Sequence, residues 1–227
     1  MDEVIESARL FAHGALATYD PGHDPSHAER VLRLSLFISD REGGDRTVIA
    51  LASLLHDVGD HKFTNGHEMA GRRAIQHWME QQKLAEPIRE GVLAVISRMG
   101  YRGPDSIEQP HSVEHAIVQD ADRLDAIGAI GIARAFSFGA FEKRSFFDPR
   151  VLPKTSMNAD EYRSHRTSSL NHFFEKLLHL KGQMLTDTGR QMAERRHRML
   201  QEYLRSFLDE WFLGDVPRPW QELLEIH

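Results

Sequence analysis

The sequence of 227 residues contains no cysteine, no excess of positive charge and no long hydrophobic run. The absence of cysteine excludes disulfides, thiolate zinc sites, iron–sulfur clusters and cysteine nucleophiles. With 28 Lys and Arg against 34 Asp and Glu, the formal net charge is −6, which argues against a broad nucleic-acid interface. The most apolar run, Val48 to Leu55, is far shorter than the roughly 20 residues of a membrane span. We therefore expect a cytoplasmic protein that binds neither nucleic acid nor a membrane.

Several common catalytic motifs are also missing. There is no Walker A loop, no GxGxxG, no GxSxG and no HExxH, although His67-Glu68-Met69-Ala70-Gly71 begins like the last of these. What the chain has instead is histidine, with 14 residues dispersed along it. Imidazoles without thiols make metal coordination by nitrogen and oxygen the first chemistry to consider.

Apolar residues recur with helical spacing nearly throughout, and no strand alternation of any length is present. Asp24-Pro25 is typical of a helix N-terminus, and Gly43-Gly44 of a helix end. We predict an all-α helical bundle that forms a single domain over residues 1–227. The expected helices are 25–42, 46–58, 66–83, 87–99, 115–138, 167–181 and 187–213.

Two stretches interrupt this pattern. Gly128 and Gly131 fall inside the predicted helix 115–138, and they indicate either close approach of another helix or a local break. Residues 139–158 form a long irregular segment with basic and aromatic side chains, among them Phe146 and Phe147. Such a segment is a candidate lid that could grip phosphates and stack on a base.

Three of the apolar helices carry ionisable residues that are costly to bury. His56-Asp57 ends the most apolar predicted helix, and His27 lies in the first turn of an earlier helix. Asp122 lies in an acidic stretch that precedes an apolar stretch of the predicted helix 115–138. Each has an ordinary structural explanation when taken alone. Together, two imidazoles and two carboxylates could give one divalent cation four ligands and leave open positions for water and substrate.

These residues and their neighbours resemble the HD-domain metal-dependent phosphohydrolases, and in particular a branch of small stand-alone bacterial HD proteins that act as nucleotide pyrophosphatases. The similarity covers nearly the whole chain. The stretches that carry it are His23-Asp24-x-x-His27-x-x-Arg30-Val31, His56-Asp57-x-x-Asp60-x-Lys62-Phe63, Asp120-Ala121-Asp122-Arg123-Leu124-Asp125-Ala126-Ile127-Gly128 and Ser169-Leu170-Asn171-His172-Phe173-Phe174-Glu175-Lys176.

The resemblance implies an HD-type bundle with a metal core at about 20–135, a candidate lid at 139–158 and C-terminal helices 159–213 packed on the core. It implies one divalent ion, with Mn²⁺, Mg²⁺, Co²⁺ and Ni²⁺ as the options. The implied ligands are His27, His56, Asp57 and Asp122.

The resemblance also suggests catalytic roles. Asp60 stands where related alarmone hydrolases carry a catalytic carboxylate, so we expect it to orient or deprotonate the attacking water. Lys62, His172 and Lys176 are candidates for holding phosphate oxygens. Exposed side chains without such a role remain an alternative for these three.

Three further residues are candidates for substrate binding. His23 could contact substrate or orient His27, and Arg123 could contact substrate or pair with an acid. His61 could bind phosphate, ligate a second ion or face water. A second metal ion is possible because four histidines have no assigned role: His61, His67, His111 and His115. The four predicted ligands require only one ion, so we expect one.

The expected function is hydrolysis of a nucleoside or deoxynucleoside triphosphate to the monophosphate and pyrophosphate. The partner is then a small nucleotide, and the oligomeric state is left open, with a homodimer among the options. The alternatives are a 5′-nucleotidase or phosphodiesterase of the same superfamily, or a sensor that binds metal and nucleotide without turnover.

Overall fold

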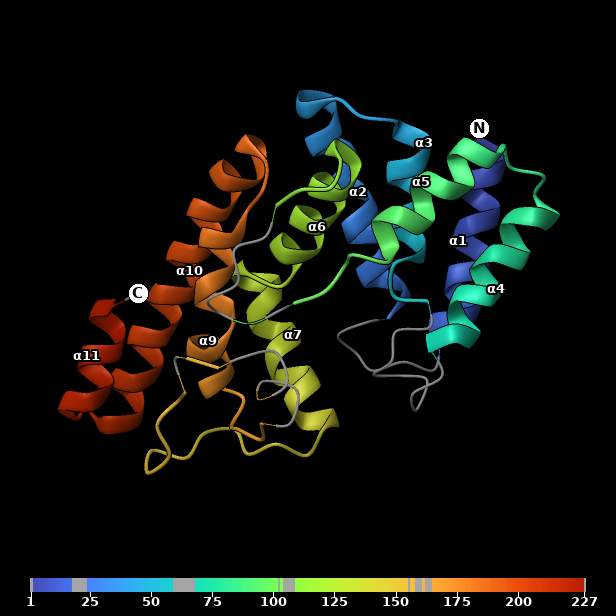
Figure 1. Ribbon diagram of the computed structural model, residues 1–227. Helices are drawn as coiled ribbons and strands as arrows, with labels where there is room; N and C mark the ends of the chain where they lie inside the picture. The colour runs from blue at the N-terminus through green and yellow to red at the C-terminus, as the bar shows by residue number, and fades with distance from the viewer. Residues whose placement is uncertain are drawn as a thin grey trace. The chain divides into compact units, whose positions relative to one another are not determined.

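The protein is described by a computed structural model that covers residues 2–17, 24–58, 68–101, 103, 109–154, 156–157, 161 and 165–226. Over these residues the chain forms helices and no strand, which confirms the all-α prediction (Figure 1). The helices are α1 (Asp2–Leu16), α2 (Pro25–Glu42), α3 (Arg46–Leu55), α4 (Glu68–Gln81), α5 (Glu86–Ile96), α6 (Val113–Asp125), α7 (Gly128–Phe141), α9 (Asn171–Glu175), the 3₁₀ helix η1 (Leu177–Gln183), α10 (Asp187–Phe212) and α11 (Arg218–Ile226).

Backbone contacts divide the chain into two compact units. Unit 1 comprises Met1–Gly100 and Gln109–Asp122, and unit 2 comprises Tyr101–Glu108 and Arg123–His227. Unit 1 therefore holds α1 to α5 and most of α6, and unit 2 holds α7 to α11. The prediction that residues 1–227 form one domain, with the C-terminal helices packed on the metal core, stays a prediction.

In unit 1, α2 begins and ends where the sequence predicts. The side chain of Asp24 accepts a hydrogen bond from the backbone N–H of His27 at 3.0 Å, and Pro25 is the first helical residue. At the other end Gly43 adopts φ 85° and ψ −145°, a conformation that ends the helix at little cost because glycine lacks a Cβ.

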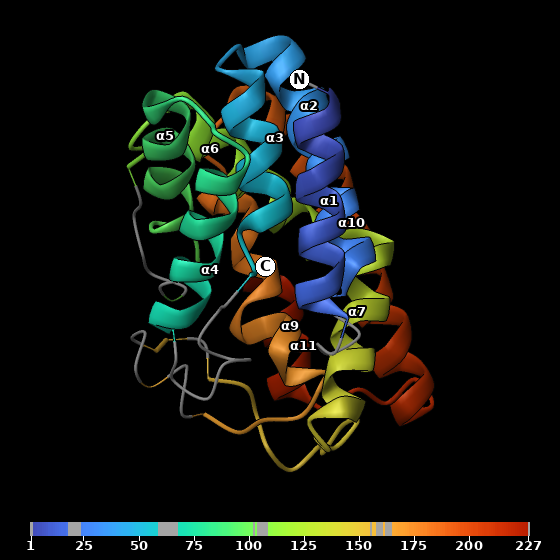
Figure 2. The same ribbon diagram turned by 90° about the vertical axis from the view of Figure 1, so that its right-hand side faces the viewer.

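The predicted central helix is α3. Asp45 caps it by accepting from the N–H groups of Thr47 and Val48, and every residue from Val48 to Leu55 is buried. It packs against α1, α2 and α5, an arrangement that can be followed in Figure 2. The helix ends at Leu55 rather than at Val58, so the following residues lie in the turn that leaves it.

The predicted helix 115–138 is wrong as one element, because the chain breaks into α6 and α7. Gly128 adopts φ +79°, and an added Cβ there would lie 3.1 Å from Arg196. At Gly131 an added Cβ would lie 2.2 Å from the carbonyl oxygen of Ala126. The two glycines therefore serve both a local break and a close approach of α10.

Unit 2 is built on α10, which packs against α7, η1 and α11. Aromatic rings fill the space around it, with Phe147 at the centre of a cluster that includes Phe207, Trp211 and Trp220. The described residues from 142 to 157 form no helix or strand, which confirms the predicted irregular segment 139–158 from residue 142 on. Its first three residues, 139–141, are helical and end α7. Because Phe147 is buried in this cluster, its ring is occupied within the protein.

The predicted helix 167–181 is also wrong. It is replaced by the short α9 and the 3₁₀ helix η1, and Lys176 between them has non-helical angles of φ −139° and ψ −58°. In a 3₁₀ helix, residues three apart share a face, and Leu177 and Leu180 are both buried in this way. The apolar pattern Leu-Leu-x-Leu thus fits either helix type, and the sequence analysis also misses α1 and α11.

Among the described residues, no single helix is long and apolar enough to cross a membrane, and only α6 and α7 taken together across their bend pass that test.

Candidate metal centre

The imidazole of His27 is fixed by the N-terminus of α2. Its backbone N–H is held by the capping side chain of Asp24, and its ring is fully buried in unit 1. A buried imidazole needs polar partners, since an unpaired polar group in a protein interior costs about 1–3 kcal/mol. Those partners come from α3 and α6.

The turn after α3 orients His56. Its Nδ1 lies 2.9 Å from the carbonyl oxygen of Ser53, and because a carbonyl only accepts, Nδ1 carries the proton. The lone pair of Nε2 is therefore free to face a cation, which is the arrangement that second-shell hydrogen bonds impose on metal-binding histidines. The hydroxyl of Ser53 bonds Ser35 of α2 at 2.8 Å and so ties the two helices together.

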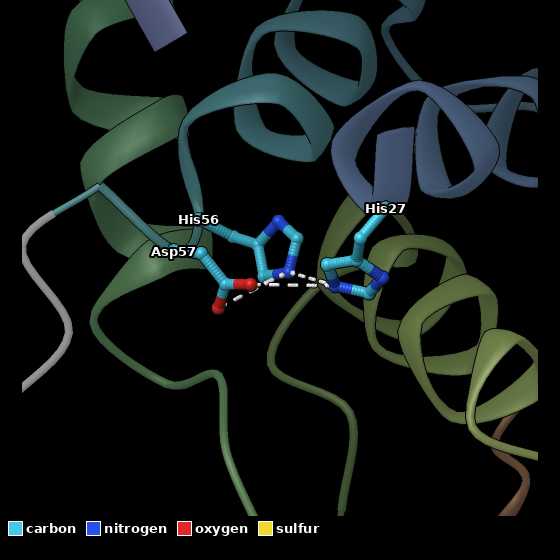
Figure 3. A group of neighbouring side chains, drawn as sticks. All are labelled: His27, His56 and Asp57. Atoms are coloured by element: carbon cyan, nitrogen blue, oxygen red, sulfur yellow. Dashed lines mark hydrogen bonds and ion pairs between the residues drawn. The ribbon is translucent and has the colours of Figure 1, made fainter. Parts of the chain in front are cut away.

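Asp57 is the third member of the group of donors formed with His27 and His56 (Figure 3). The Nε2 of His27 lies 3.3 Å from the Nε2 of His56 and 3.3 Å from Oδ2 of Asp57. The Nε2 of His56 lies 3.4 Å from Oδ1 of Asp57. Figure 3 shows the three side chains turned toward one another from the beginning of α2 and the end of α3.

Asp122 of α6 joins the same group. Its Oδ1 lies 3.4 Å from Nε2 of His27 and 3.9 Å from Nε2 of His56. Burial would raise the pKa of Asp122, but the hydrogen bond from His27 and the charges of the two imidazoles hold it well below its usual range. Its side chain keeps 30% of its exposure, so the carboxylate forms the solvent-facing edge of the group.

This donor set fits a divalent cation. For bonds of about 2.1 Å, neighbouring donors lie about 3.0 Å apart in an octahedral site and about 3.4 Å apart in a tetrahedral one. The observed separations of 3.3 to 3.9 Å lie at or slightly above these values. His27, His56 and Asp57 each offer a ligand atom within 4.8 Å of the others, so they could hold a metal ion. All four donors belong to unit 1.

Four candidate residues lie outside the described residues: His23, Asp60, His61 and Lys62. Their predicted roles stay predictions.

The three remaining candidates belong to unit 2. Arg123 is buried, and its guanidinium donates a hydrogen bond to the carbonyl oxygen of Gln183, which favours a structural role over the predicted contact with substrate. His172 and Lys176 are half-buried at α9 and its C-terminal end. The Nζ of Lys176 lies 4.9 Å from the centre of the Tyr101 ring, at cation–π distance.

Sequence reasoning missed the groups that orient the donors. The carbonyl of Ser53 fixes the tautomer of His56, but a backbone carbonyl has no signature in the sequence. The serine pair Ser35–Ser53 could have been found, because each serine lies on the buried face of its helix. A buried serine among apolar residues needs a hydrogen-bond partner.

Comparisons with known proteins agree with this site. The HD domain family model matches residues 26–127, the range that contains all four donors. The uncharacterized protein YpgQ of Bacillus subtilis (strain 168) is 34% identical over 204 residues, covering 88% of this chain and 90% of YpgQ.

Solved structures are similar over more than nine tenths of this chain. An HD-superfamily hydrolase of Bacillus thuringiensis is 38% identical with a TM-score of 0.71, covering 92% of this chain and 97% of its own. Bacillus subtilis YpgQ in complex with ADP is 30% identical with a TM-score of 0.72, covering 91% and 97%. A protein of Lactobacillus plantarum is 31% identical with a TM-score of 0.83, covering 94% and 99%.

Proposed function

The chain belongs to the HD domain family, and from that premise we propose that it is a divalent-metal-dependent phosphohydrolase that cleaves nucleoside or deoxynucleoside triphosphates to monophosphate and pyrophosphate. The observation that carries this proposal is the convergence of His27 from α2, His56 and Asp57 from the turn after α3, and Asp122 from α6. Two neutral imidazoles and two carboxylates are a poor hydrogen-bonded core and a good ligand set.

His27, His56, Asp57 and Asp122 would hold the ion. When bound, the ion would lower the pKa of a coordinated water and would place positive charge beside the phosphoryl oxygens of the substrate. Ser53 keeps the proton of His56 on Nδ1 and away from the ligand position. Asp122 lies at the solvent-facing edge of the group and completes the ligand set.

The remaining steps belong to side chains assigned from the sequence. Asp60 orients the attacking water or accepts its proton. Lys62, His172 and Lys176 offset the negative charge that develops on the phosphate oxygens. His23 and His61 contact the substrate or orient neighbouring groups. We assign Arg123 a structural role, which is supported by its hydrogen bond to the carbonyl oxygen of Gln183.

A nucleotide substrate is supported by the relative YpgQ, whose structure contains ADP. A diphosphate nucleotide held by a protein of 30% identity makes a nucleotide the first substrate class to test. A cytoplasmic location and one ion per chain complete the proposal, and a homodimer remains an option.

The test is a product screen. The purified protein is incubated with each common ribo- and deoxynucleoside triphosphate and with Mn²⁺, Mg²⁺, Co²⁺ or Ni²⁺, and pyrophosphate and orthophosphate are measured separately. We expect pyrophosphate and the monophosphate in equal amounts. Orthophosphate released from monophosphates would indicate a nucleotidase instead, and nucleotide binding without product would indicate a sensor. His56→Ala is the matched control, since it removes one ligand.

A further inference from the structure

A further buried acid, Glu175, lies in unit 2, away from the four donors in the sequence and with no role in the proposal above. Glu175, the last residue of α9, is 1% exposed. A carboxylate in a protein interior is costly unless hydrogen bonds compensate for its lost hydration. The hydrogen-bond donors around Glu175 therefore show which segments its carboxylate binds.

One oxygen of Glu175 collects three donors from the irregular segment. Its Oε1 accepts from the backbone N–H of Lys154 at 3.2 Å, from the hydroxyl of Thr167 at 3.1 Å, and lies 3.1 Å from Nε2 of His165. We call the described residues between 142 and 167 the strap. The carboxylate thus binds the middle and the end of the strap at one point.

Asn171 adds a second attachment on the same face of α9, because residues four apart lie one above the other on a helix. Its side-chain amide donates to the carbonyl oxygen of Val151 at 2.9 Å. The start of the strap is held separately, by the buried ring of Phe147 and by Trp220, whose indole N–H donates to the carbonyl of Pro149 at 3.3 Å. The described part of the strap is therefore fastened rather than a freely moving lid.

Glu175 also touches the residues that follow it. Its backbone carbonyl lies 3.5 Å from the hydroxyl of Tyr101, and the ring of Tyr101 lies under the ammonium group of Lys176. Lys176 leaves helical geometry directly after Glu175, so the direction of its side chain depends on where α9 is held. The attachment of the strap and the position of Lys176 thus meet at one residue.

We propose that Glu175 is a positioning residue for the substrate-binding side of the reaction: by fastening the strap to α9 it fixes the direction in which His172 and Lys176 meet the phosphate groups. This inference rests on the proposed function and on the predicted roles of those two residues. It assigns no contact between Glu175 and the substrate.

The experiment compares Glu175→Ala with Glu175→Gln. Glutamine keeps an acceptor oxygen for the strap at nearly the same size, and alanine removes it. With a triphosphate and the best metal, we expect Glu175→Ala to raise KM about tenfold while kcat stays within about threefold, and Glu175→Gln to restore KM to within about threefold. An unchanged KM with less active protein would show a purely structural role and overturn the proposal.

A second readout does not depend on activity. Hydrogen exchange at the amide of Lys154 should be about tenfold or more faster in Glu175→Ala than in the wild-type protein, because that N–H loses its acceptor. If the wild-type protein shows no hydrolysis but this exchange difference is present, the proposed function fails and the fastening stands. If exchange at Lys154 is unchanged, the fastening itself is wrong.

Two further variants keep the test usable if Glu175→Ala does not fold. Thr167→Val removes one of the three donors and leaves the carboxylate, so a smaller rise in KM is expected. Glu142→Gln is the matched control, since Glu142 lies on the strap but bonds only the exposed Arg166 in the described structure. No change in KM is expected for it.

Discussion

Each unit of the protein contains a buried acid beside histidine, and the two sites differ in what faces the acid. In unit 1, Asp57 and Asp122 face imidazole nitrogens, and one of these imidazoles has its proton turned away toward Ser53. In unit 2, Glu175 faces an N–H, a hydroxyl and an imidazole from its own chain. In unit 1 the carboxylates face ring nitrogens that can ligate a cation, whereas one oxygen of Glu175 already accepts three hydrogen bonds.

The difference teaches that burial of a carboxylate does not by itself mark a metal site. A buried acid needs positive charge or hydrogen-bond donors, and the surrounding atoms decide which of the two it takes. The comparison can therefore be tested by removing acids from either unit and asking which protein loses metal.

The largest effect is expected in unit 1. His56→Ala and Asp57→Ala should each abolish metal binding and lower turnover by about a thousandfold or more, because each removes one of the four donors. Metal content per chain, measured on purified protein with turnover in parallel, checks this. Glu175→Gln is the matched variant in unit 2 and should keep its metal. Full metal content in Asp57→Ala would show that the two acids do not differ in the way described.

The next effect separates binding from chemistry within unit 1. Asp60→Ala should keep the metal and lower kcat about a hundredfold, the usual contribution of a general base. Metal content and kcat, measured on the same preparation, test whether Asp60 acts in the chemical step and not in metal binding. Full activity with normal metal content would remove Asp60 from the mechanism and return it to an ordinary turn residue.

The third effect concerns stability. A metal that binds only the folded protein stabilises it by about 2.7 kcal/mol at a concentration one hundred times its Kd. For a domain of this size that corresponds to a rise in Tm of about 5–10 °C. Mn²⁺ should raise the Tm of the wild-type protein and of Glu175→Gln alike, and leave that of His56→Ala unchanged. An equal rise in His56→Ala would place the stabilising metal elsewhere.

The sequence predicts unit 1 better than unit 2, for physical reasons. The ends of α2 depend on local rules, the Asp24 cap and the positive φ of Gly43, and local rules can be read from neighbouring residues. The four donors could be predicted because two imidazoles and two carboxylates together make a ligand set and their sequence contexts resemble the HD-domain phosphohydrolases, although each alone has an ordinary structural explanation. Their geometry agrees with that prediction.

Unit 2 escaped prediction because its key contacts are not local. Glu175 lies in the run Phe-Phe-Glu-Lys-Leu-Leu, where an acid can equally be the exposed residue of an amphipathic helix. Its donors come from Lys154, His165 and Thr167, in a segment without periodicity. The break at Lys176 depends on packing as well, since the same leucines fit an α helix or a 3₁₀ helix.

The smallest effect comes from a third acid, which lies on the strap at the surface. Hydrogen bonds from the guanidinium and the backbone N–H of Arg150 hold the pKa of Asp148 at about 2, below its ordinary 3.8. A carboxyl whose pKa is depressed by folding stabilises the fold above its ordinary pKa, and that contribution is lost as the pH falls through about 2. Asp148→Asn should therefore lower Tm slightly near neutral pH, by at most about 2 °C, because the pair is solvated.

The pH and salt dependence distinguish this pair from the buried acids. The difference in Tm between the wild-type protein and Asp148→Asn should shrink between about pH 4 and pH 2, and should also shrink in 1 M salt, which screens exposed charges beyond about 3 Å. The effect of Glu175→Ala on exchange at Lys154 should persist in 1 M salt, because a carboxylate that is 1% exposed is shielded from the ions. Equal salt sensitivity at both positions would mean that Glu175 is solvated in solution, and the contrast between a surface acid and a buried hub would disappear.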